Sequence, residues 1–151
     1  MKSALILICK IPKYLINFRK KYDYHTNIPG HITLCYLKED TNYSEVINLL
    51  NKINKFNICL NNIVKKEDIL YLSLKNVKKI NNINKKIKKY IEKIPKSGYH
   101  LTLGLNKKKL KIPEEEINKI KIPITINIEK IWLMKKEDKE WYRSQTIFLK
   151  N

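Results

Sequence analysis

Apolar and polar positions follow one another along the chain in a pattern that predicts strands and helices in turn. Apolar runs bounded by turn residues predict strands at residues 4–9, 56–64, 69–74, 122–134 and 141–149. Apolar residues at helical spacing predict helices at residues 12–21, 41–55, 77–94 and 113–119. Thr41 is a typical capping residue for the second helix, Pro95 ends the third, and Pro113 lies in the first turn of the fourth. The last two strands are expected to form a hairpin around the polar sequence KKEDKE.

Two further apolar runs each place a histidine two residues before a threonine. They are PGHITLCYL at residues 29–37 and SGYHLTLGL at residues 97–105. Side chains two residues apart in an extended strand share a face. The residues expected on the two motif faces are His31, Thr33, Cys35, His100, Thr102 and Gly104. The apolar residues expected to pack behind them are Ile32, Leu34, Tyr36, Leu101, Leu103 and Leu105.

The repeated motif indicates two similar halves. Two of the three histidines in the chain open this motif, and they lie 69 residues apart. A predicted helix precedes the motif strand in each half. The small residues Cys35 and Gly104 are expected to leave room above each strand for a ligand. We therefore predict that His31 and His100 face each other across a central cleft.

Two imidazoles and two hydroxyls around one cleft are suited to phosphodiester cleavage. A histidine with an ordinary pKa of about 6.5 can accept or donate a proton near neutral pH. One histidine can then activate the attacking oxygen while the other protonates the leaving oxygen. Thr33 and Thr102 would donate hydrogen bonds to the phosphoryl oxygens. His25 is expected in a loop, and since no Cys or His cluster offers a metal site, we predict no metal and no cofactor.

The doubled motif in a chain of this length resembles the 2H phosphoesterase superfamily, and the resemblance covers essentially the whole chain. This superfamily includes RNA 2′,3′-cyclic phosphodiesterases (also called RNA 2′,5′ ligases), 2′,5′-oligoadenylate phosphodiesterases and viral enzymes that degrade cyclic dinucleotides. The resemblance implies a bilobal α+β fold of two pseudo-symmetric halves, each with a sheet that carries one HxT strand and with flanking helices. It also implies metal-independent catalysis by His31 and His100, with Thr33 and Thr102 binding phosphate.

The chain departs from many members of the superfamily that act on RNA ends. Those members have proline before each motif histidine, where this chain has Gly30 and Tyr99. They often have arginine three residues after the second threonine, where this chain has Leu105. The missing cation weakens the match to the bacterial RNA-end enzymes.

Three further residues are candidate contacts to a base or a phosphate. Tyr142 and Arg143 fall where the last strand of the family often brings side chains to the cleft, and Tyr99 precedes the second motif histidine. An aromatic ring there can stack on a base, and an arginine can clamp a phosphate. The alternatives are a strand-edge aromatic for Tyr142 and a surface cation for Arg143. Trp132 and Trp141 are expected to be packing residues.

The formal charge of +18 has two interpretations. All but two of the 32 basic residues are lysine. Because lysine, isoleucine and asparagine share A/T-rich codons, the first interpretation is that solvated lysines follow from an AT-rich genome. The second is that the lysines form a surface that attracts nucleic acid by neutralising phosphates. Either origin would draw a polyanionic substrate.

The remaining features indicate a single cytoplasmic domain over residues 1–151. Cys9, Cys35 and Cys59 are dispersed in apolar runs, which is typical of reduced thiols. The apolar stretch at residues 4–9 is too short for a signal sequence or a membrane span. We expect a monomer that does not contact membranes.

The function predicted from the sequence is a metal-independent phosphodiesterase that acts on a small 2′–5′-linked or cyclic oligonucleotide. Signalling nucleotides fit this class, for example 2′,5′-oligoadenylate or a cyclic dinucleotide such as cyclic GMP-AMP, and a viral enzyme that degrades a host alarm nucleotide is one setting for it. A first alternative is an RNA-end 2′,3′-cyclic phosphodiesterase. A second is a non-catalytic basic RNA-binding module whose histidines only contact phosphate.

Overall fold

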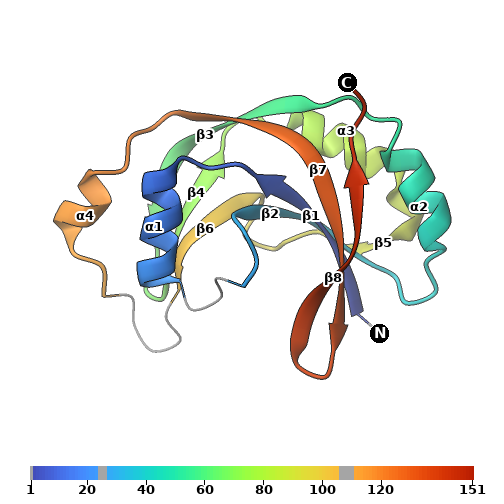
Figure 1. Cartoon of the computed structure of the whole chain (residues 1–151), viewed down its shortest axis with the longest axis horizontal. Coiled ribbons are helices and arrows are strands. Elements are labelled where there is room, and N and C mark those ends of the chain that lie inside the picture. The colour runs from blue at the N-terminus through green and yellow to red at the C-terminus, as the bar shows by residue number, and fades with distance from the viewer. Residues whose placement is uncertain (1, 24–26, 106–110) are drawn as a thin grey trace.

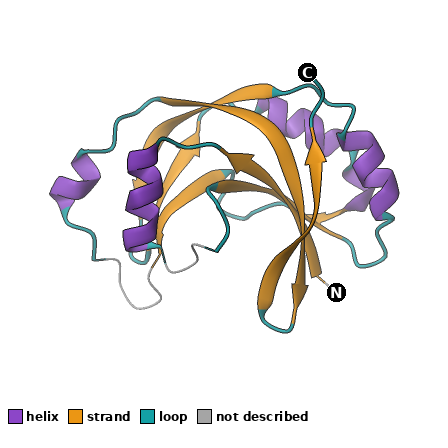
Figure 2. Ribbon diagram, in the orientation of Figure 1, coloured by secondary structure: helices purple, strands orange, loops and turns teal. Residues whose placement is uncertain are grey.

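The computed structural model describes residues 2–23, 27–105 and 111–151 (Figures 1 and 2). Its strands are β1 (Lys2–Cys9), β2 (His31–Leu37), β3 (Phe56–Lys65), β4 (Ile69–Leu74), β5 (Ile91–Lys93), β6 (His100–Leu105), β7 (Ile124–Glu137) and β8 (Glu140–Phe148). Its helices are α1 (Lys13–Tyr22), α2 (Tyr43–Leu50), α3 (Lys78–Lys86) and α4 (Glu114–Asn118), with a 3-10 turn at Lys88–Tyr90. Within the described ranges, no helix is long and apolar enough to cross a membrane.

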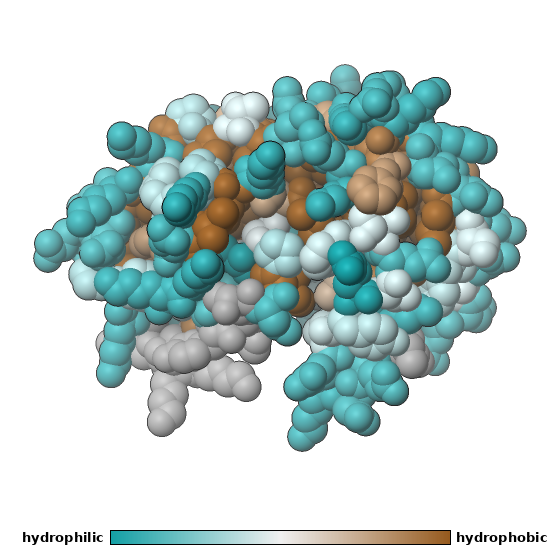
Figure 3. Space-filling view, viewed as in Figure 1, coloured by the Kyte–Doolittle hydropathy of each residue, from teal (hydrophilic) through white to brown (hydrophobic). Residues whose placement is uncertain are grey.

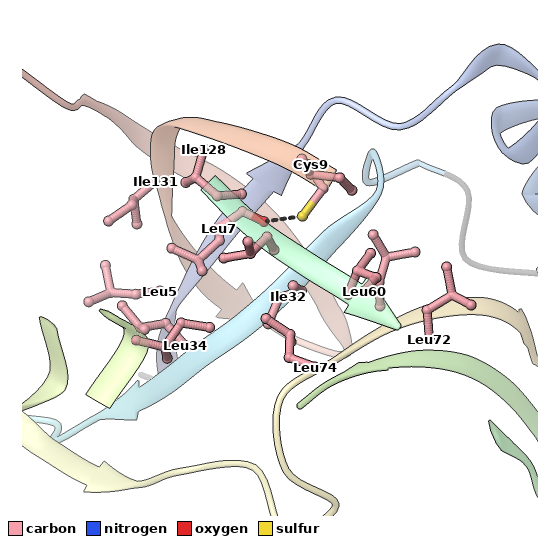
Figure 4. Close-up of a cluster of buried hydrophobic side chains, with 14 of the residues drawn as sticks. Leu5, Leu7, Cys9, Ile32, Leu34, Leu60, Leu72, Leu74, Ile128 and Ile131 are labelled. Carbon is pink, nitrogen blue, oxygen red and sulfur yellow. Dashed lines mark hydrogen bonds between the residues drawn. The ribbon is translucent and has the colours of Figure 1, made fainter. Parts of the chain in front are cut away.

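The strands form one 8-stranded antiparallel sheet that closes on itself. The hydrogen-bonded order is β1-β2-β6-β4-β3-β7-β8, with the short β5 paired to β2, and a further pairing of β7 with β1 completes the circuit. Strand β7 can do this because it is long: its first part pairs with β3, and its later part pairs with β1 and β8. Figure 4 shows the result, with Leu5, Ile32, Leu60 and Ile128 from four strands gathered in one buried cluster.

The two motif strands meet where the two halves of the molecule join. Strands β2 and β6 share one antiparallel pair, Ile32 opposite Leu101, and both residues are fully buried. Helix α1 packs against β6, and α3 contacts β2, so each motif strand has a helix behind it. Figure 2 shows α1 and α4 at one end of the sheet and α2 and α3 at the other. This arrangement confirms the predicted α+β fold with one HxT strand in each half.

Both motif strands contain a β-bulge directly after the threonine. In the pairing of β1 with β2, Ile6 lies opposite Thr33 and Leu5 opposite Cys35, so Leu34 is an extra residue. In the pairing of β4 with β6, the partners pass from Thr102 to Gly104 in the same way, so Leu103 is extra. An extra residue shifts the alternation of side chains by one position.

Because of the bulges, the fourth residue after each histidine points into the interior and does not share the predicted face with the histidine. Cys35 is fully buried in the main apolar cluster, and Gly104 is buried too. A Cβ at Gly104 would lie 2.7 Å from Cδ1 of Ile112 and 3.3 Å from Cβ of Tyr22. The small residue therefore serves the packing behind the strand. It does not create the space beside the histidines.

Two predicted helices are shorter in the structure. The helix expected at residues 41–55 is α2, and its cap is Asn42, which accepts a hydrogen bond from the Glu45 amide, in place of Thr41. The chain after α2 instead pairs with the C-terminal segment, where the Lys55 amide donates to the Lys150 carbonyl. The helix expected at residues 77–94 ends at Lys86, because Ile87 and Tyr90 turn into the core and β5 then adds to β2.

The remaining predicted elements are present. The closing hairpin is longer than expected, since most of KKEDKE is strand and the turn occupies only Asp138 and Lys139, with a positive φ of 56° at Asp138. Pro113 lies at the N-cap of α4, one position before its first turn. Figure 3 shows hydrophilic side chains over most of one face, with apolar strips between them.

We predict that Gly104→Ala lowers the free energy of unfolding by about 1–3 kcal/mol, because the new methyl group overpacks the interior behind β6. Urea denaturation measures this change. If the glycine instead left space for a ligand, the variant would unfold as the wild type does and would only bind nucleotide more weakly; that result would contradict the packing role.

Candidate active site

The four motif residues form a compact group on one face of the paired strands. Because Ile32 lies opposite Leu101 in an antiparallel pair, Thr102 lies opposite His31 and His100 lies opposite Thr33. All four side chains are partly exposed, whereas the residues between them are buried. Diagonal neighbours in such a pairing have Cα atoms about 7 Å apart, so His31 and His100 stand close enough on the backbone for both imidazoles to reach one phosphoryl group.

Each histidine is held by the same backbone contact. The Nδ1 atom of His31 lies 2.8 Å from the Pro29 carbonyl oxygen, and Nδ1 of His100 lies 2.9 Å from the Gly98 carbonyl oxygen. A carbonyl only accepts hydrogen bonds, so Nδ1 carries a proton and donates it in both rings. Nε2 is then the ring nitrogen that can take up or release a proton. Gly98 has a positive φ of 76°, a conformation that glycine adopts readily, at the turn that presents its carbonyl.

The surroundings of the two imidazoles differ. Burial lowers the pKa of His31 below its ordinary value, the charge of Arg19 adds to this effect, and the hydrogen bond to Pro29 opposes it. His31 is therefore a neutral imidazole at neutral pH, with a lone pair on Nε2. The His100 ring packs against Tyr71, with ring centroids 4.7 Å apart, and this contact fixes the ring from β4.

A buried arginine ties the two motifs together. Arg19 on α1 is only 6% exposed, and its guanidinium donates to the Thr102 carbonyl, the Ile28 carbonyl and the Asp23 carboxylate, each at 3.2 Å. Thr102 belongs to the second motif, and Ile28 lies in the segment that enters the first. The rigid, planar donor fork of arginine suits this three-way contact.

Cavities lie on both sides of the motif residues. The larger, of about 820 Å³, is lined by His31, Thr102, Leu105, Ile28, Asn27, Arg19, Asp23, Lys139, Glu140 and Trp141. The smaller, of about 240 Å³, is lined by His100, Tyr36, Lys93, Ile94, Pro95, Lys96 and Ser97. The bulges help to form both, because they return Tyr36 and Leu105 to the face of the histidines. Each histidine lines its own cavity, so the described residues do not show the single central cleft that the sequence predicts between the two histidines.

The three further candidates from the sequence do not reach these cavities. Tyr99 lies directly before β6 and packs against the main apolar cluster, and its hydroxyl accepts a hydrogen bond from the Asn84 side-chain amide at 2.8 Å. Tyr142 lies on the other face of the hairpin from Trp141. Arg143 shares the Trp141 face, but its guanidinium stacks over the Trp132 ring at 4.9 Å.

The aromatic residue of β8 that lines the cavity is Trp141, whereas the sequence predicted Tyr142. Its side chain lines the larger cavity and packs against Tyr36, with ring centroids 6.3 Å apart. The sequence reasoning assigned Trp141 to packing and missed Arg19 altogether. One signal was available for Arg19, because Asp23 follows it by four residues, the spacing of a helical ion pair; the helix predicted at residues 12–21 ended before Asp23, so this pair was not recognised. His25 lies outside the described residues.

Other reactive groups near the site are accounted for. Burial raises the pKa of the Cys35 thiol to about 12, so it stays protonated behind the strand. In the described part of the chain, no group of three or more His, Cys, Asp or Glu side chains is placed to hold a metal ion. The motif residues themselves place two imidazoles and two hydroxyls on this face.

Comparison with known proteins identifies the fold. No protein-family model and no curated protein sequence matches the chain. Solved structures do match. The alignment with E. coli LigT complexed with 3′-AMP covers 100% of each chain at 13% identity, with a TM-score of 0.55. TT0787 of Thermus thermophilus covers 99% of this chain and 98% of its own, at 14% identity and a TM-score of 0.62. Kluyveromyces marxianus Usb1 with uridine monophosphate covers 98% of both chains, at 9% identity and a TM-score of 0.61.

These neighbours are members of the 2H phosphoesterase superfamily. At such low identities the likeness shows the fold, and it extends over nearly the whole chain. The chain therefore has the fold of the 2H phosphoesterases, as the doubled HxT motif predicts.

We predict that His31 titrates below its ordinary pKa of about 6.5 and that Arg19→Gln moves this pKa upward, because one nearby positive charge is lost. NMR titration of the imidazole signals measures both values, with His31→Ala used for assignment. Arg19→Lys is the matched control, since it keeps the charge but not the planar donor fork, and it should leave the His31 pKa low. An unchanged pKa in Arg19→Gln would contradict the electrostatic contribution.

Proposed function

We propose that this chain is a metal-independent phosphodiesterase that cleaves nucleotide phosphodiesters with His31 and His100 as general base and general acid. The observation that supports this most directly is the matched anchoring of the two imidazoles, each through Nδ1 to a carbonyl two residues earlier. Two imidazoles at diagonal positions of one strand pair, each with Nε2 available for proton transfer, suit in-line displacement at phosphorus. The shared fold with known phosphoesterases supports the same conclusion.

In the proposed reaction on a 2′–5′ linkage, the neighbouring 3′-hydroxyl attacks phosphorus. Nε2 of His31 takes the hydroxyl proton, since burial keeps this imidazole neutral. The bond between O3′ and phosphorus forms while the bond from phosphorus to O5′ breaks. Nε2 of His100 gives its proton to the departing O5′, and the product carries a 2′,3′-cyclic phosphate. Hydrolysis of that ring would use water with the two roles exchanged.

The threonines stabilise the charge that develops during this step. Thr33 lies opposite His100 and Thr102 lies opposite His31, so each imidazole has a hydroxyl beside it across the strand pair. A hydroxyl that donates to a nonbridging phosphoryl oxygen is worth most in the transition state, where negative charge is greatest.

The substrate that we propose is a small 2′–5′-linked or cyclic oligonucleotide, such as 2′,5′-oligoadenylate or a cyclic dinucleotide. A cleft of about 820 Å³ with an aromatic wall fits a nucleoside on the His31 side. Processing of RNA ends is the second candidate, favoured by fold neighbours whose structures hold 3′-AMP and uridine monophosphate.

We predict that His31→Ala and His100→Ala each lower kcat by about 100-fold or more, because each removes one of two required proton transfers. Assays with cyclic GMP-AMP, 2′,5′-oligoadenylate and RNA with a 2′,3′-cyclic end measure turnover and rank the substrate classes. Activity should persist in excess EDTA. Loss of activity in chelator with recovery on adding zinc or manganese would overturn the mechanism.

We also predict that Trp141→Leu raises KM about tenfold or more, since stacking of a base on an aromatic ring contributes about 1–3 kcal/mol. Tyr142→Leu is the matched control: it changes the adjacent aromatic residue on the other face of the hairpin and should leave KM within about twofold. Steady-state kinetics on the best substrate of the screen measures both. A larger effect from Tyr142→Leu would show that the base binds elsewhere.

A further inference from the structure

The two cavities beside the histidines differ in charge. The described residues that line the larger cavity include two cations, Arg19 and Lys139, and two carboxylates, Asp23 and Glu140. Arg19 and Asp23 are paired with each other at 3.2 Å. Carboxylates are scarce in this chain, with 14 acidic residues against 32 basic ones, so two of them around one cavity oppose the general positive field. The charges of these four side chains cancel, so the described lining on this side offers a phosphate no net positive charge.

The smaller cavity beside His100 is cationic. Lys93 and Lys96 line it together with Ser97 and Tyr36, and its other described residues carry no carboxylate. Lysine ammonium groups and a serine hydroxyl are donors suited to phosphate oxygens. The size of about 240 Å³ suits a small anionic group better than a complete nucleotide.

The backbone fixes these donors in relation to His100. Lys93 lies on β5, opposite Tyr36 of β2, and its ammonium lies 5.2 Å from the centre of the Tyr36 ring. Lys96 and Ser97 occupy the centre of a tight turn that the Gly98 amide closes by donating to the Pro95 carbonyl at 3.2 Å. The carbonyl of Gly98 in turn accepts from Nδ1 of His100. The turn that presents these two donors therefore also anchors the proposed general acid.

We propose that the pocket formed by Lys93, Lys96 and Ser97 binds a second phosphate of the substrate, carried on the 2′ or 3′ oxygen of the leaving nucleoside. This assignment rests on the proposed function, and it defines how the substrate is oriented between the two cavities. The nucleoside that supplies the attacking hydroxyl lies on the His31 side, against Trp141 and Leu105. The leaving nucleoside lies on the His100 side, with its next phosphate in the cationic pocket.

This orientation of the substrate defines a substrate class, in which the leaving nucleoside carries a further phosphate. A cyclic dinucleotide satisfies it, because the leaving nucleoside remains joined to a second phosphodiester. A linear 2′–5′ oligomer satisfies it at every internal linkage. A dinucleoside monophosphate does not, because its leaving nucleoside carries no further phosphate.

The test compares three 2′–5′-linked adenosine dinucleotides: one with no additional phosphate, one with a phosphate on the 3′ oxygen of the leaving nucleoside, and one with a phosphate on the 5′ oxygen of the attacking nucleoside. We expect the leaving-side phosphate to raise kcat/KM about tenfold, the gain typical of charge-assisted hydrogen bonds. The attacking-side phosphate should change it by about twofold or less. Equal gains from the two phosphates would overturn the proposal.

Substitutions of lysines beside each cavity test which cavity causes the preference for the leaving-side phosphate. The double substitution Lys93→Gln and Lys96→Gln should abolish the preference, so that the dinucleotide with the leaving-side phosphate is cleaved no faster than the unphosphorylated one. Lys139→Gln, a lysine change beside the larger cavity, is the matched control and should keep the preference. A preference that survives the double substitution would contradict the assignment.

A binding measurement separates this inference from the proposed function. Analogues of the three dinucleotides with 3′-deoxyribose on the attacking side lack the nucleophile, so titration calorimetry can measure their affinities without turnover. If the chain cleaves none of the dinucleotides but binds the leaving-side phosphate analogue about tenfold more tightly, the phosphate pocket stands and the catalytic proposal fails. Cleavage without any such preference in binding or rate would leave the catalytic proposal standing and overturn the pocket.

Discussion

A single strand pairing governs the geometry of this molecule. Strands β2 and β6 share only the pair of Ile32 and Leu101, and both side chains are fully buried beneath the motif face. This one pair sets which histidine lies opposite which threonine and how far apart the two histidines stand on the backbone. Arg19 reinforces it from α1 by bonding to the carbonyls of Thr102 and Ile28, one associated with each motif. Packing on one side of the sheet thereby fixes the chemistry available on the other.

Much of the fold was accessible from the sequence, and the limits have physical causes. Alternation placed the histidines and threonines correctly, because it depends only on local backbone geometry up to the bulge. It failed from Cys35 and Gly104 onward, since a bulge depends on pairing with a neighbouring strand. The helix predicted at residues 77–94 ended early for the same kind of reason: its later apolar residues serve the core and a strand edge.

In the candidate site too, features set by local sequence could be predicted, and features set by contacts across the fold could not. The motif residues carry a recognisable local pattern, whereas the roles of Arg19 and Trp141 depend on contacts across the fold. Trp141 and Tyr142 differ by one position, and only the register of the hairpin decides which ring lines the cavity. The net charge of +18 also gave no indication of the local balance, because the scarce carboxylates Asp23 and Glu140 lie beside the larger cavity.

The paired bulges have a consequence for how related chains can be recognised. Because the extra residue turns the fourth position after each histidine inward, that position is constrained by the volume of the interior and is indifferent to the ligand. The fifth position, occupied by Tyr36 and Leu105, faces the cavities instead and is open to diversification as substrates change. A search pattern for distant relatives should therefore demand a small side chain at the fourth position, which faces the interior, and leave the fifth unrestricted, because it faces the cavities.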